Sequence, residues 1–459
     1  MMPVKLPLMR LLVVLLVLSS FVSHAAVHSA ANNPQTATQP AATLQYAWVA
    51  GSTFITRDST SGFSTNNGCI YATSSGEFTS QVPVPNGASI TALDLYWLDN
   101  DTSNVTPTFT LQDTNGLNSP QTIATVSVSA TGTASYHYEL PAPYLVNLKN
   151  RGLFMEWTPK VFNENVQLCG VRISYSPPAL PLSTTDYAFL VGTTANIRDT
   201  ATDRGYSGGG CVNLKNSGRY LSMDVDLPEG AIISSLTSYF YDNSTSANFA
   251  VSLLEFNGTS LQTIATVTQA LTSTNHASVN FVLPQPYTVK EISKSLSLQA
   301  DFGGVLNNTI RFCGVRFTYT NPSQPAQKDA RFITGNTFVP RTFDGDFNFS
   351  SDANGCLSVD DVGLPKPLNA FVRIPDGATM TRVTYYYKLG SAAADLYLVS
   401  FDATGTQQDL TKATVLNPIA TVPNGTTSNN MTKGYAFLWN PGIAGPDRTL
   451  CGAKVEFEF

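Results

Sequence analysis

The sequence predicts an all-β protein made of three tandem β-sandwich, jelly-roll-like domains that follow a signal peptide. Three observations support this prediction. One set of short landmarks recurs three times in the same order, runs of alternating apolar and polar residues dominate between turn residues, and every copy contains one early and one late cysteine. The chain has 459 residues, a length that suits several domains of roughly 100–200 residues each.

The composition narrows the class of protein. Only 13% of the residues are charged and 42% are hydrophobic, whereas disordered chains combine low hydrophobicity with high charge. We therefore expect a folded chain. The formal net charge is −6, and nucleic-acid-binding domains usually present a basic face, so we expect no nucleic-acid partner.

The N-terminus has the three parts of a secretory signal peptide. Lys5 and Arg10 supply positive charge, an apolar run extends from Leu11 to Val22, and Ser23-His24-Ala25 fits a small-x-small cleavage site. A membrane-spanning helix needs about 20 apolar residues, and this run is shorter. Residues 1–25 are thus predicted to be removed on export, after which no stretch of the sequence is apolar enough to span a membrane.

Export places the mature chain outside the cytoplasm. We expect a secreted protein, located extracellularly or at the cell surface, with the periplasm as a further location. Residues 26–44 are rich in Ala, Asn, Gln, Thr and Pro, and we expect them to form a disordered leader ahead of the first domain.

The repeats divide the rest of the chain. Repeat 1 covers residues 45–176, repeat 2 covers 187–320 and repeat 3 covers 331–459, with prolines in the connecting segments. Each is large enough to bury its own core, so we expect three domains that fold separately in series. The landmarks are Gly51, Thr53, Arg57, Gly68-Cys69, Pro85-x-Gly87, Ile123–Val126 and Cys169-Gly170 in repeat 1; Gly192, Thr194, Arg198, Gly210-Cys211, Pro228-x-Gly230, Ile264–Val267 and Cys313-Gly314 in repeat 2; and Gly335, Thr337, Arg341, Gly355-Cys356, Pro375-x-Gly377, Ile419–Val422 and Cys451-Gly452 in repeat 3.

Within each repeat the pattern is that of short strands between Gly, Pro, Asn and Asp residues. An aromatic strand follows the Pro-x-Gly turn, at Leu93–Trp97, Leu236–Phe240 and Val383–Tyr387. The first and last residue of each of these runs share one face by the two-residue period of a strand, and we assign that face to the core. The strand after the late cysteine of repeat 1 alternates in the same way through Val171–Tyr175.

The repeat also selects one cysteine pairing. Only Cys69–Cys169, Cys211–Cys313 and Cys356–Cys451 keep the three repeats equivalent and independent. Each bond would close a loop of about 100 residues, which is worth about 4–5 kcal/mol in the chain-entropy account. Zinc sites usually draw on cysteines that lie closer in sequence. We therefore expect structural disulfides, as exported proteins commonly have.

The sequence predicts no catalytic residue, no metal site and no cofactor. Gly205-Tyr206-Ser207-Gly208-Gly209 matches G-x-S-x-G, but it lacks the strand-to-helix elbow that makes such a serine a nucleophile. His137 and His276 lie in strand-like stretches, and repeat 3 has no histidine. Asp344-x-Asp346-x-Asn348 begins like a calcium loop, but the following residue is not the glycine that an EF-hand requires. Calcium binding in a β-domain loop stays an alternative.

Two further residue types recur in register. Tyr96, Tyr239 and Tyr386 project from the face opposite the predicted core, and they are the candidate binding residues because exposed rings on a sheet can carry sugar rings. Cross-strand aromatic pairing, or burial on a second packed face, is the alternative that we favour. Arg57, Arg198 and Arg341 are expected to tie down a loop rather than to bind a ligand.

Three features of the repeated unit carry a resemblance to other proteins. They are the Pro-x-Gly-Ala turn, the aromatic strand, and the Asp-Asn pair that follows this strand at Asp99-Asn100 and Asp242-Asn243. The unit resembles repeat modules of uncharacterised bacterial secreted and surface proteins. Repeat 3 departs from the pattern, with Lys388-Leu389-Gly390 in place of Asp-Asn. The resemblance implies a β-sandwich and an extracellular location, and it transfers no activity and no binding residue.

These observations favour an exported, non-catalytic protein of several modules, used for surface attachment or for ligand binding. Carbohydrate or a surface protein is the expected kind of partner, because weak sites repeated along a chain gain avidity. Two alternatives stay open. One is a secreted hydrolase that acts on glycans, although no pair of acids recurs in all three repeats. The other is a purely structural stalk.

Overall fold

The structure is a computed structural model that describes residues 44–459, except for 104, 118–119, 128–130, 179–184, 246–247, 270–273, 323–326, 343–347, 353, 360–366, 389–393, 424 and 443–447. The expected signal peptide (1–25) and all but the last residue of the expected leader (26–44) lie outside the described residues. Ala42–Phe459 forms one compact unit.

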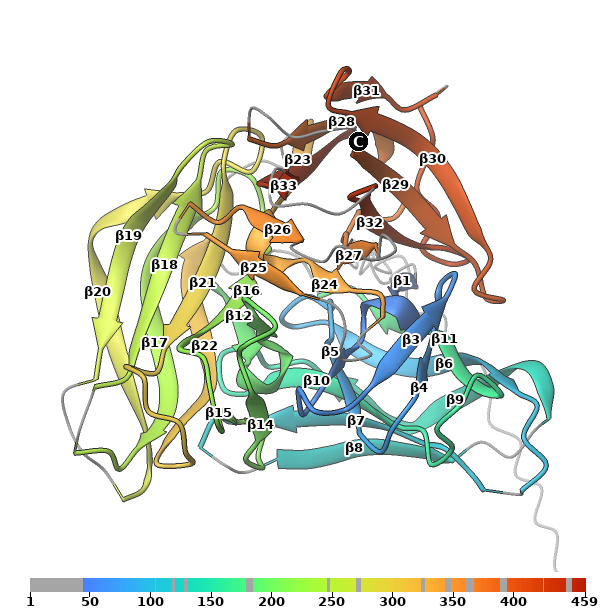
Figure 1. Ribbon diagram of the computed structural model, residues 1–459, viewed down its shortest axis with the longest axis horizontal. Coiled ribbons are helices and arrows are strands. Elements are labelled where there is room, and N and C mark those ends of the chain that lie inside the picture. Colours follow the sequence, from blue (N-terminus) through green and yellow to red (C-terminus); the bar gives the residue numbers. More distant parts are fainter. Residues whose placement is uncertain are drawn as a thin grey trace, which may run out of the picture. The chain divides into compact units, whose positions relative to one another are not determined.

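The fold is all-β, as predicted. Antiparallel sheets are connected by turns, three short 3₁₀ turns interrupt them, and the described residues contain no α-helix. Figure 1 shows the strands of repeat 1 in blue to teal, those of repeat 2 in green to yellow and those of repeat 3 in orange to red. None of the described residues forms a helix that is long and apolar enough to cross a membrane.

Repeat 1 contains two antiparallel sheets. The first has the order β3-β4-β11-β6-β9, with β1 also paired to β11, and the second has the order β2-β5-β10-β7-β8. From β4 to β11 the chain passes between the sheets in the order of a jelly roll. The strands are β1 (Gln45–Ala50), β2 (Ile55–Thr56), β3 (Phe63–Asn66), β4 (Cys69–Ala72), β5 (Phe78–Gln81), β6 (Ser89–Asp99), β7 (Thr108–Thr114), β8 (Pro120–Ser127), β9 (Gly132–Leu145), β10 (Gly152–Thr158) and β11 (Val166–Ser176).

Repeat 2 has the same arrangement. Its sheets have the orders β14-β15-β22-β17-β20, with β12 paired to β22, and β13-β16-β21-β18-β19. The strands are β12 (Thr185–Val191), β13 (Asn196–Ile197), β14 (Arg204–Tyr206), β15 (Val212–Leu214), β16 (Tyr220–Asp224), β17 (Ile232–Asp242), β18 (Ala250–Phe256), β19 (Leu261–Thr268), β20 (His276–Thr288), β21 (Ser295–Asp301) and β22 (Ile310–Thr320).

Repeat 3 differs in one respect. Its first sheet is divided into β23-β34-β28-β31 and β25-β26-β33, because the strand that runs through the late cysteine in the other repeats is interrupted at Cys451. The second sheet, β24-β27-β32-β29-β30, is complete. The strands are β23 (Lys328–Thr334), β24 (Val339–Pro340), β25 (Phe349–Ser351), β26 (Leu357–Val359), β27 (Leu368–Phe371), β28 (Thr379–Tyr386), β29 (Asp395–Phe401), β30 (Gln407–Thr414), β31 (Ile419–Thr421), β32 (Gly434–Asn440), β33 (Thr449–Leu450) and β34 (Gly452–Glu458).

The predicted aromatic strand lies in the middle of the first sheet of every repeat, as part of β6, β17 and β28. Its assigned core face is buried. Leu93 and Leu236 belong to the apolar clusters between the two sheets of their repeats, as does Val383. Tyr387 follows the end of β28 and is only partly buried. Alternation along the strand therefore identified the inner face correctly.

Each repeat has its own core, but side chains of neighbouring repeats join some of these clusters. The core of repeat 2 is built from its own residues. By contrast, Phe189, Tyr239 and the Cys211–Cys313 pair of repeat 2 pack within the core cluster of repeat 1. Residues of repeat 3 likewise surround Ala50 of repeat 1. The repeats are thus in direct contact instead of being separated by their connecting segments.

The contacts between repeats form a closed cycle. In each repeat a polar side chain of the second sheet donates a hydrogen bond to the backbone carbonyl at the centre of a 3₁₀ turn in another repeat. The turns are η1 (Gly51–Thr53), η2 (Gly192–Thr194) and η3 (Gly335–Thr337). The bonds are Thr79 Oγ1 to Thr193 O at 3.1 Å, Ser222 Oγ to Asn336 O at 2.7 Å, and Asn369 Nδ2 to Ser52 O at 2.7 Å. All six residues are buried. Repeat 1 thereby contacts repeat 2, repeat 2 contacts repeat 3, and repeat 3 contacts repeat 1.

Candidate functional site

The three candidate tyrosines each stack on an aromatic ring of their own repeat. Tyr96 stacks on Trp48, Tyr239 on Phe189 and Tyr386 on Phe332, with ring centroids 4.7, 5.0 and 4.4 Å apart. Tyr96 and Tyr239 are 8% and 7% exposed, and Tyr386 is partly buried. The structure does not bring the three rings together into one site.

A turn from another repeat covers this aromatic pair. A Cβ added to Gly116 of repeat 1 would lie 2.5 Å from the ring of Tyr239, and one added to Gly258 of repeat 2 would lie 2.6 Å from the ring of Tyr386. The corresponding glycine of repeat 3, Gly405, lies against Cys69 of repeat 1. Two of the three rings thus lie under a neighbouring repeat.

The three repeated arginines also reach into another repeat. Their partners lie on the strand just before the early cysteine of that repeat, which is β14 in repeat 2, β25 in repeat 3 and β3 in repeat 1. The guanidinium carbon of Arg57 lies 3.3 Å from the centre of the Tyr206 ring, Arg198 Nε lies 3.1 Å from Ser351 Oγ, and Arg341 Nε lies 2.8 Å from Thr65 Oγ1. Burial lowers the pKa of Arg341 to about 10. The expectation that these side chains tie down a loop is consistent with their contacts, but the loop belongs to the next repeat.

A third repeated contact comes from the basic residue that follows each Cys-Gly pair by two positions. In every case the cation donates a hydrogen bond to a backbone carbonyl of another repeat. These carbonyls lie in the turns after β9 and β20 and at the equivalent place in repeat 3. The pairs are Arg172 Nη1 with Met431 O at 2.5 Å, Arg316 Nη1 with Lys149 O at 2.5 Å, and Lys454 Nζ with Ile292 O at 2.7 Å. The landmarks that define the repeat in the sequence are therefore largely the residues that join the repeats to one another.

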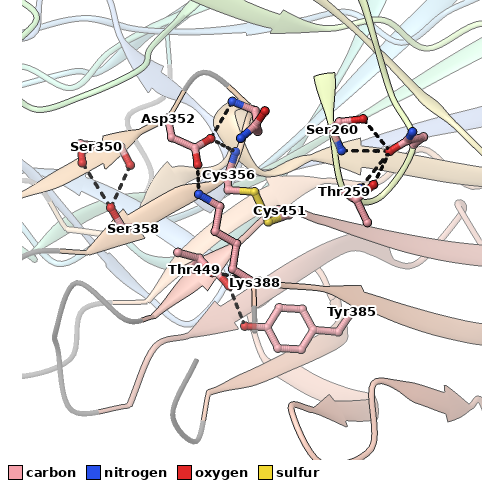
Figure 2. Close-up of a disulfide and its surroundings, with 12 residues drawn as sticks. Thr259, Ser260, Ser350, Asp352, Cys356, Ser358, Tyr385, Lys388, Thr449 and Cys451 are labelled. Atoms are coloured by element: carbon pink, nitrogen blue, oxygen red, sulfur yellow. Dashed lines mark hydrogen bonds and ion pairs between the residues drawn. A yellow bond between two sulfur atoms is a disulfide. The ribbon is translucent and has the colours of Figure 1, made fainter. Parts of the chain in front are cut away.

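The structure contains the three predicted disulfides, Cys69–Cys169, Cys211–Cys313 and Cys356–Cys451. Figure 2 shows the last of these, where Lys388 forms an ion pair with Asp352, and the backbone N–H of Cys356 donates to that carboxylate over 3.0 Å. Leu261 of repeat 2 packs against the apolar cluster that contains this disulfide. The bonds are thus part of the contacts between repeats, and they are consistent with an extracellular location.

The other motifs of the sequence do not form a catalytic group among the described residues. Ser207 donates its hydroxyl hydrogen bond to Asn213 and not to a histidine, while His137 pairs with Asp94 at 2.8 Å on the sheet surface. His276 lies near Cys211 and Cys313 with ligand atoms within 4.8 Å of one another, but both sulfurs are in the disulfide. Asp344 and Asp346 lie outside the described residues.

A cavity of about 700 Å³ lies where the three repeats meet, and all three contribute to its wall. Aromatic and proline side chains dominate the wall. The tyrosines are Tyr46, Tyr175, Tyr187, Tyr319 and Tyr435, and the prolines are Pro83, Pro85, Pro177, Pro178, Pro228 and Pro375. We call this space the central cavity. A cavity of about 210 Å³ adjoins it and shares several wall residues with it.

The repeats are not equivalent in the charges that they present to the central cavity. Two positions before the turn proline, repeat 1 has Pro83, repeat 2 has Asp226 and repeat 3 has Arg373, and all three line the cavity. Four positions before the first landmark glycine, repeats 1 and 2 have alanine where repeat 3 has Arg331. Arg331 Nε lies 2.8 Å from Asp226 Oδ1, and Arg373 Nη1 lies 3.6 Å from Asp226 Oδ2.

Two more acids of repeat 2 stand beside this ion pair, around a space of about 40 Å³. Burial, reinforced by the charge of Asp226, raises the pKa of Asp224 to about 8. Burial also raises the pKa of Glu291 well above its usual range, and the positive charge of Arg331 opposes that rise. Glu291 is 2% exposed, and one of its carboxyl oxygens has no hydrogen-bond partner. Sequence reasoning missed this charged group because its members do not recur in the three repeats.

The sequence matches no protein-family model and no curated protein. Among solved structures, the similar chains include one from the Sulfolobus Turreted Icosahedral Virus, at 8% identity over 89% of this chain and 94% of that one with a TM-score of 0.21. A tandem CBM22 domain of Paenibacillus barcinonensis Xyn10C has 13% identity over 63% of this chain and 100% of that one, with a TM-score of 0.22. Likenesses at this level carry no argument about this chain.

Proposed function

We propose that this chain is an exported, non-catalytic binding protein whose three tandem β-sandwich domains, 45–176, 187–320 and 331–459, act together. Residues 1–25 serve as its signal peptide and 26–44 as a leader in this proposal, and the mature chain works extracellularly or at the cell surface. The sequence repeats, the three disulfides and the separate core of repeat 2 support it. The closed cycle of contacts supports joint action of the repeats.

The central cavity is the observation that carries the binding function. It has about 700 Å³ of space, which lies in the range of small-molecule sites. Its tyrosine and proline wall offers flat apolar surface together with hydroxyl groups, a combination suited to a small carbohydrate. Since each repeat supplies only part of the wall, the described residues form one such site from all three repeats together.

The acids at the cavity favour binding over hydrolysis. Glycosidases usually place two carboxyl groups on either side of the scissile bond. Asp226 forms an ion pair with Arg331 at 2.8 Å. The other two acids of the wall are also engaged, since Asp186 accepts hydrogen bonds from Asn86 and Asn321, and Asp376 accepts one from the backbone of Asn430. We therefore do not propose glycan hydrolysis, the alternative that the sequence left open.

The test is a glycan-array and polysaccharide pull-down with residues 26–459, followed by calorimetry on the ligands found. We expect one ligand per chain. Filling the cavity with Ala188→Phe should weaken binding at least tenfold, because Ala188 lines the central cavity. Tyr136→Ala, which removes an exposed ring on β9, is the control and should bind normally. Three equivalent sites per chain, unchanged binding by Ala188→Phe, or the absence of any bound glycan would overturn the proposal.

A further inference from the structure

Arg373 occupies a special place in the central cavity. It follows β27 and stands two residues before the Pro375 turn, where it lines the central cavity and both smaller cavities beside it. The two equivalent positions carry Pro83 and Asp226. At this position of the repeat, only repeat 3 has a cation among the described residues.

The guanidinium of Arg373 has donors to spare. Within the described part of the chain its ion-pair partner is Asp226, at 3.6 Å, which is longer than a hydrogen bond to a charged group. An arginine has five N–H donors in a planar fork. The side chain of Arg373 is 34% exposed and Arg373 lines the central cavity, so its donors are accessible to a ligand.

The neighbouring cation is committed to the protein. Arg331 Nε lies 2.8 Å from Asp226, its Nη1 donates to the carbonyl of Ala330 at 2.9 Å, and Asp329 lies 3.8 Å away. Its side chain is only 11% exposed. Arg331, which also lines the cavity, thus compensates the charge of Asp226 and leaves the fork of Arg373 available to a ligand.

The surroundings of Arg373 suit a sugar that carries one negative group. Tyr175 of repeat 1 and Tyr319 of repeat 2 line the same cavity. Both tyrosines have pKa values raised by burial, an effect that the charge of Arg373 opposes, so the cation lies within electrostatic reach of both rings. The phenols stay protonated and keep their polar, hydroxyl-bearing edges.

The acids of the wall limit how much negative charge a ligand can bring. Asp186 accepts hydrogen bonds from Asn86 at 2.9 Å and from Asn321 at 3.1 Å, and Asp376 accepts one from the backbone of Asn430 at 2.7 Å. These carboxylates are bonded but remain in the wall of the cavity. A polyanion would meet the repulsion of these acids and of Asp226, whereas a single carboxylate can bind at Arg373, because Arg331 compensates the charge of Asp226.

We propose that Arg373 anchors the carboxylate of an acidic sugar in the central cavity. This inference rests on the proposed binding function and adds the chemical class of the ligand. The planar fork of arginine pairs with the two oxygens of a carboxylate through two parallel hydrogen bonds, and lysine cannot reproduce that geometry. The sugar ring would then lie against the tyrosine and proline wall.

The experiment compares two probes on the full mature chain, a trisaccharide of two glucose residues and one terminal glucuronic acid residue, which carries a single carboxylate, and the matching trisaccharide of glucose. Wild-type protein should bind the acidic probe at least tenfold more tightly. Arg373→Gln should bind the acidic probe about 10–100-fold more weakly, the usual effect of losing a charged hydrogen bond. Arg373→Lys should recover only part of the loss, and the affinity for the glucose probe should change little in both variants.

Arg219→Gln is the matched control, because Arg219 pairs with Asp301 at 2.8 Å outside the cavity wall and is 54% exposed. It should bind both probes as the wild type does, and thermal melts should show that all variants are folded. Equal wild-type affinity for the two probes, or an Arg373→Gln variant that keeps the preference, would refute the role of Arg373 while the binding function stands. If neither probe nor any other glycan binds, the proposed function itself is wrong.

Discussion

Replacing Asn369 by alanine removes the hydrogen bond through which repeat 3 closes the cycle onto repeat 1. Asn369 Nδ2 lies 2.7 Å from the carbonyl oxygen of Ser52, and both residues are 1% exposed. A buried acceptor that loses its donor costs about 1–3 kcal/mol. The cavity left by the shorter side chain adds to this. We expect the free energy of unfolding to fall by about 2–4 kcal/mol.

Urea unfolding followed by tryptophan fluorescence measures this change. Trp48 is a suitable reporter, since Gly434 of repeat 3 lies directly against its ring. Ser222→Ala removes the equivalent bond between repeats 2 and 3 and should have an effect of similar sign and smaller size, because less volume is lost. Asn150→Ala, at an exposed site in repeat 1, should change the free energy by less than about 0.5 kcal/mol. If Asn369→Ala unfolds like Asn150→Ala, the junction contributes nothing and the argument for a closed cycle fails.

Four further predictions follow from the disulfides, the turns, the acids and the cores. Cys313→Ser should cost about 2–5 kcal/mol and leave one reactive thiol, and mass mapping that links cysteines of different repeats would contradict the pairing. Gly405→Ala should destabilise by about 1–3 kcal/mol more than Gly377→Ala in thermal melts, because both glycines have left-handed backbone but only Gly405 touches Cys69; equal losses would show that the contact is unimportant. Because the pKa of Asp224 is raised to about 8, the folded protein keeps a proton that the unfolded chain releases near pH 4. The free energy of unfolding should therefore decline as pH rises from about 4 to about 8. Asp224→Asn should flatten that decline. Residues 187–320 expressed alone under oxidising conditions should unfold cooperatively, but at lower denaturant than the whole chain, and a non-cooperative transition would rule out separate folding.

Local patterns in the sequence were sufficient for the inner faces of the sheets. Leu93 and Ile173 follow a two-residue alternation that a strand imposes on its own side chains, and both are fully buried. The disulfides were predictable for a similar reason, since the repeat leaves one pairing that treats every copy alike. These features depend on residues that are close in sequence or on the comparison of one copy with another.

The outer faces could not be predicted in this way. Alternation places Tyr239 on the side away from its own core, but whether that side meets solvent depends on what covers it. Here the cover is the Gly116 turn of another repeat. In the same way the sequence shows that Arg57 recurs, but nothing local indicates that it reaches Tyr206 of repeat 2. The charged residues of the central cavity could not be predicted for the opposite reason. Asp226 and Arg373 occupy a position at which the three repeats have different residues.

Joining the repeats in one chain has a consequence for how the centre of the molecule can change. Three identical subunits around a symmetry axis must place the same residue there three times, so an arginine at this place would face two like charges. In one chain the three positions are separate codons, and Pro83, Asp226 and Arg373 can each mutate alone. The hydrogen bonds of the closed cycle lie at the 3₁₀ turns, so the centre can diversify while these bonds stay intact. A gene triplication can thus turn a symmetric assembly into one with a single, asymmetric centre.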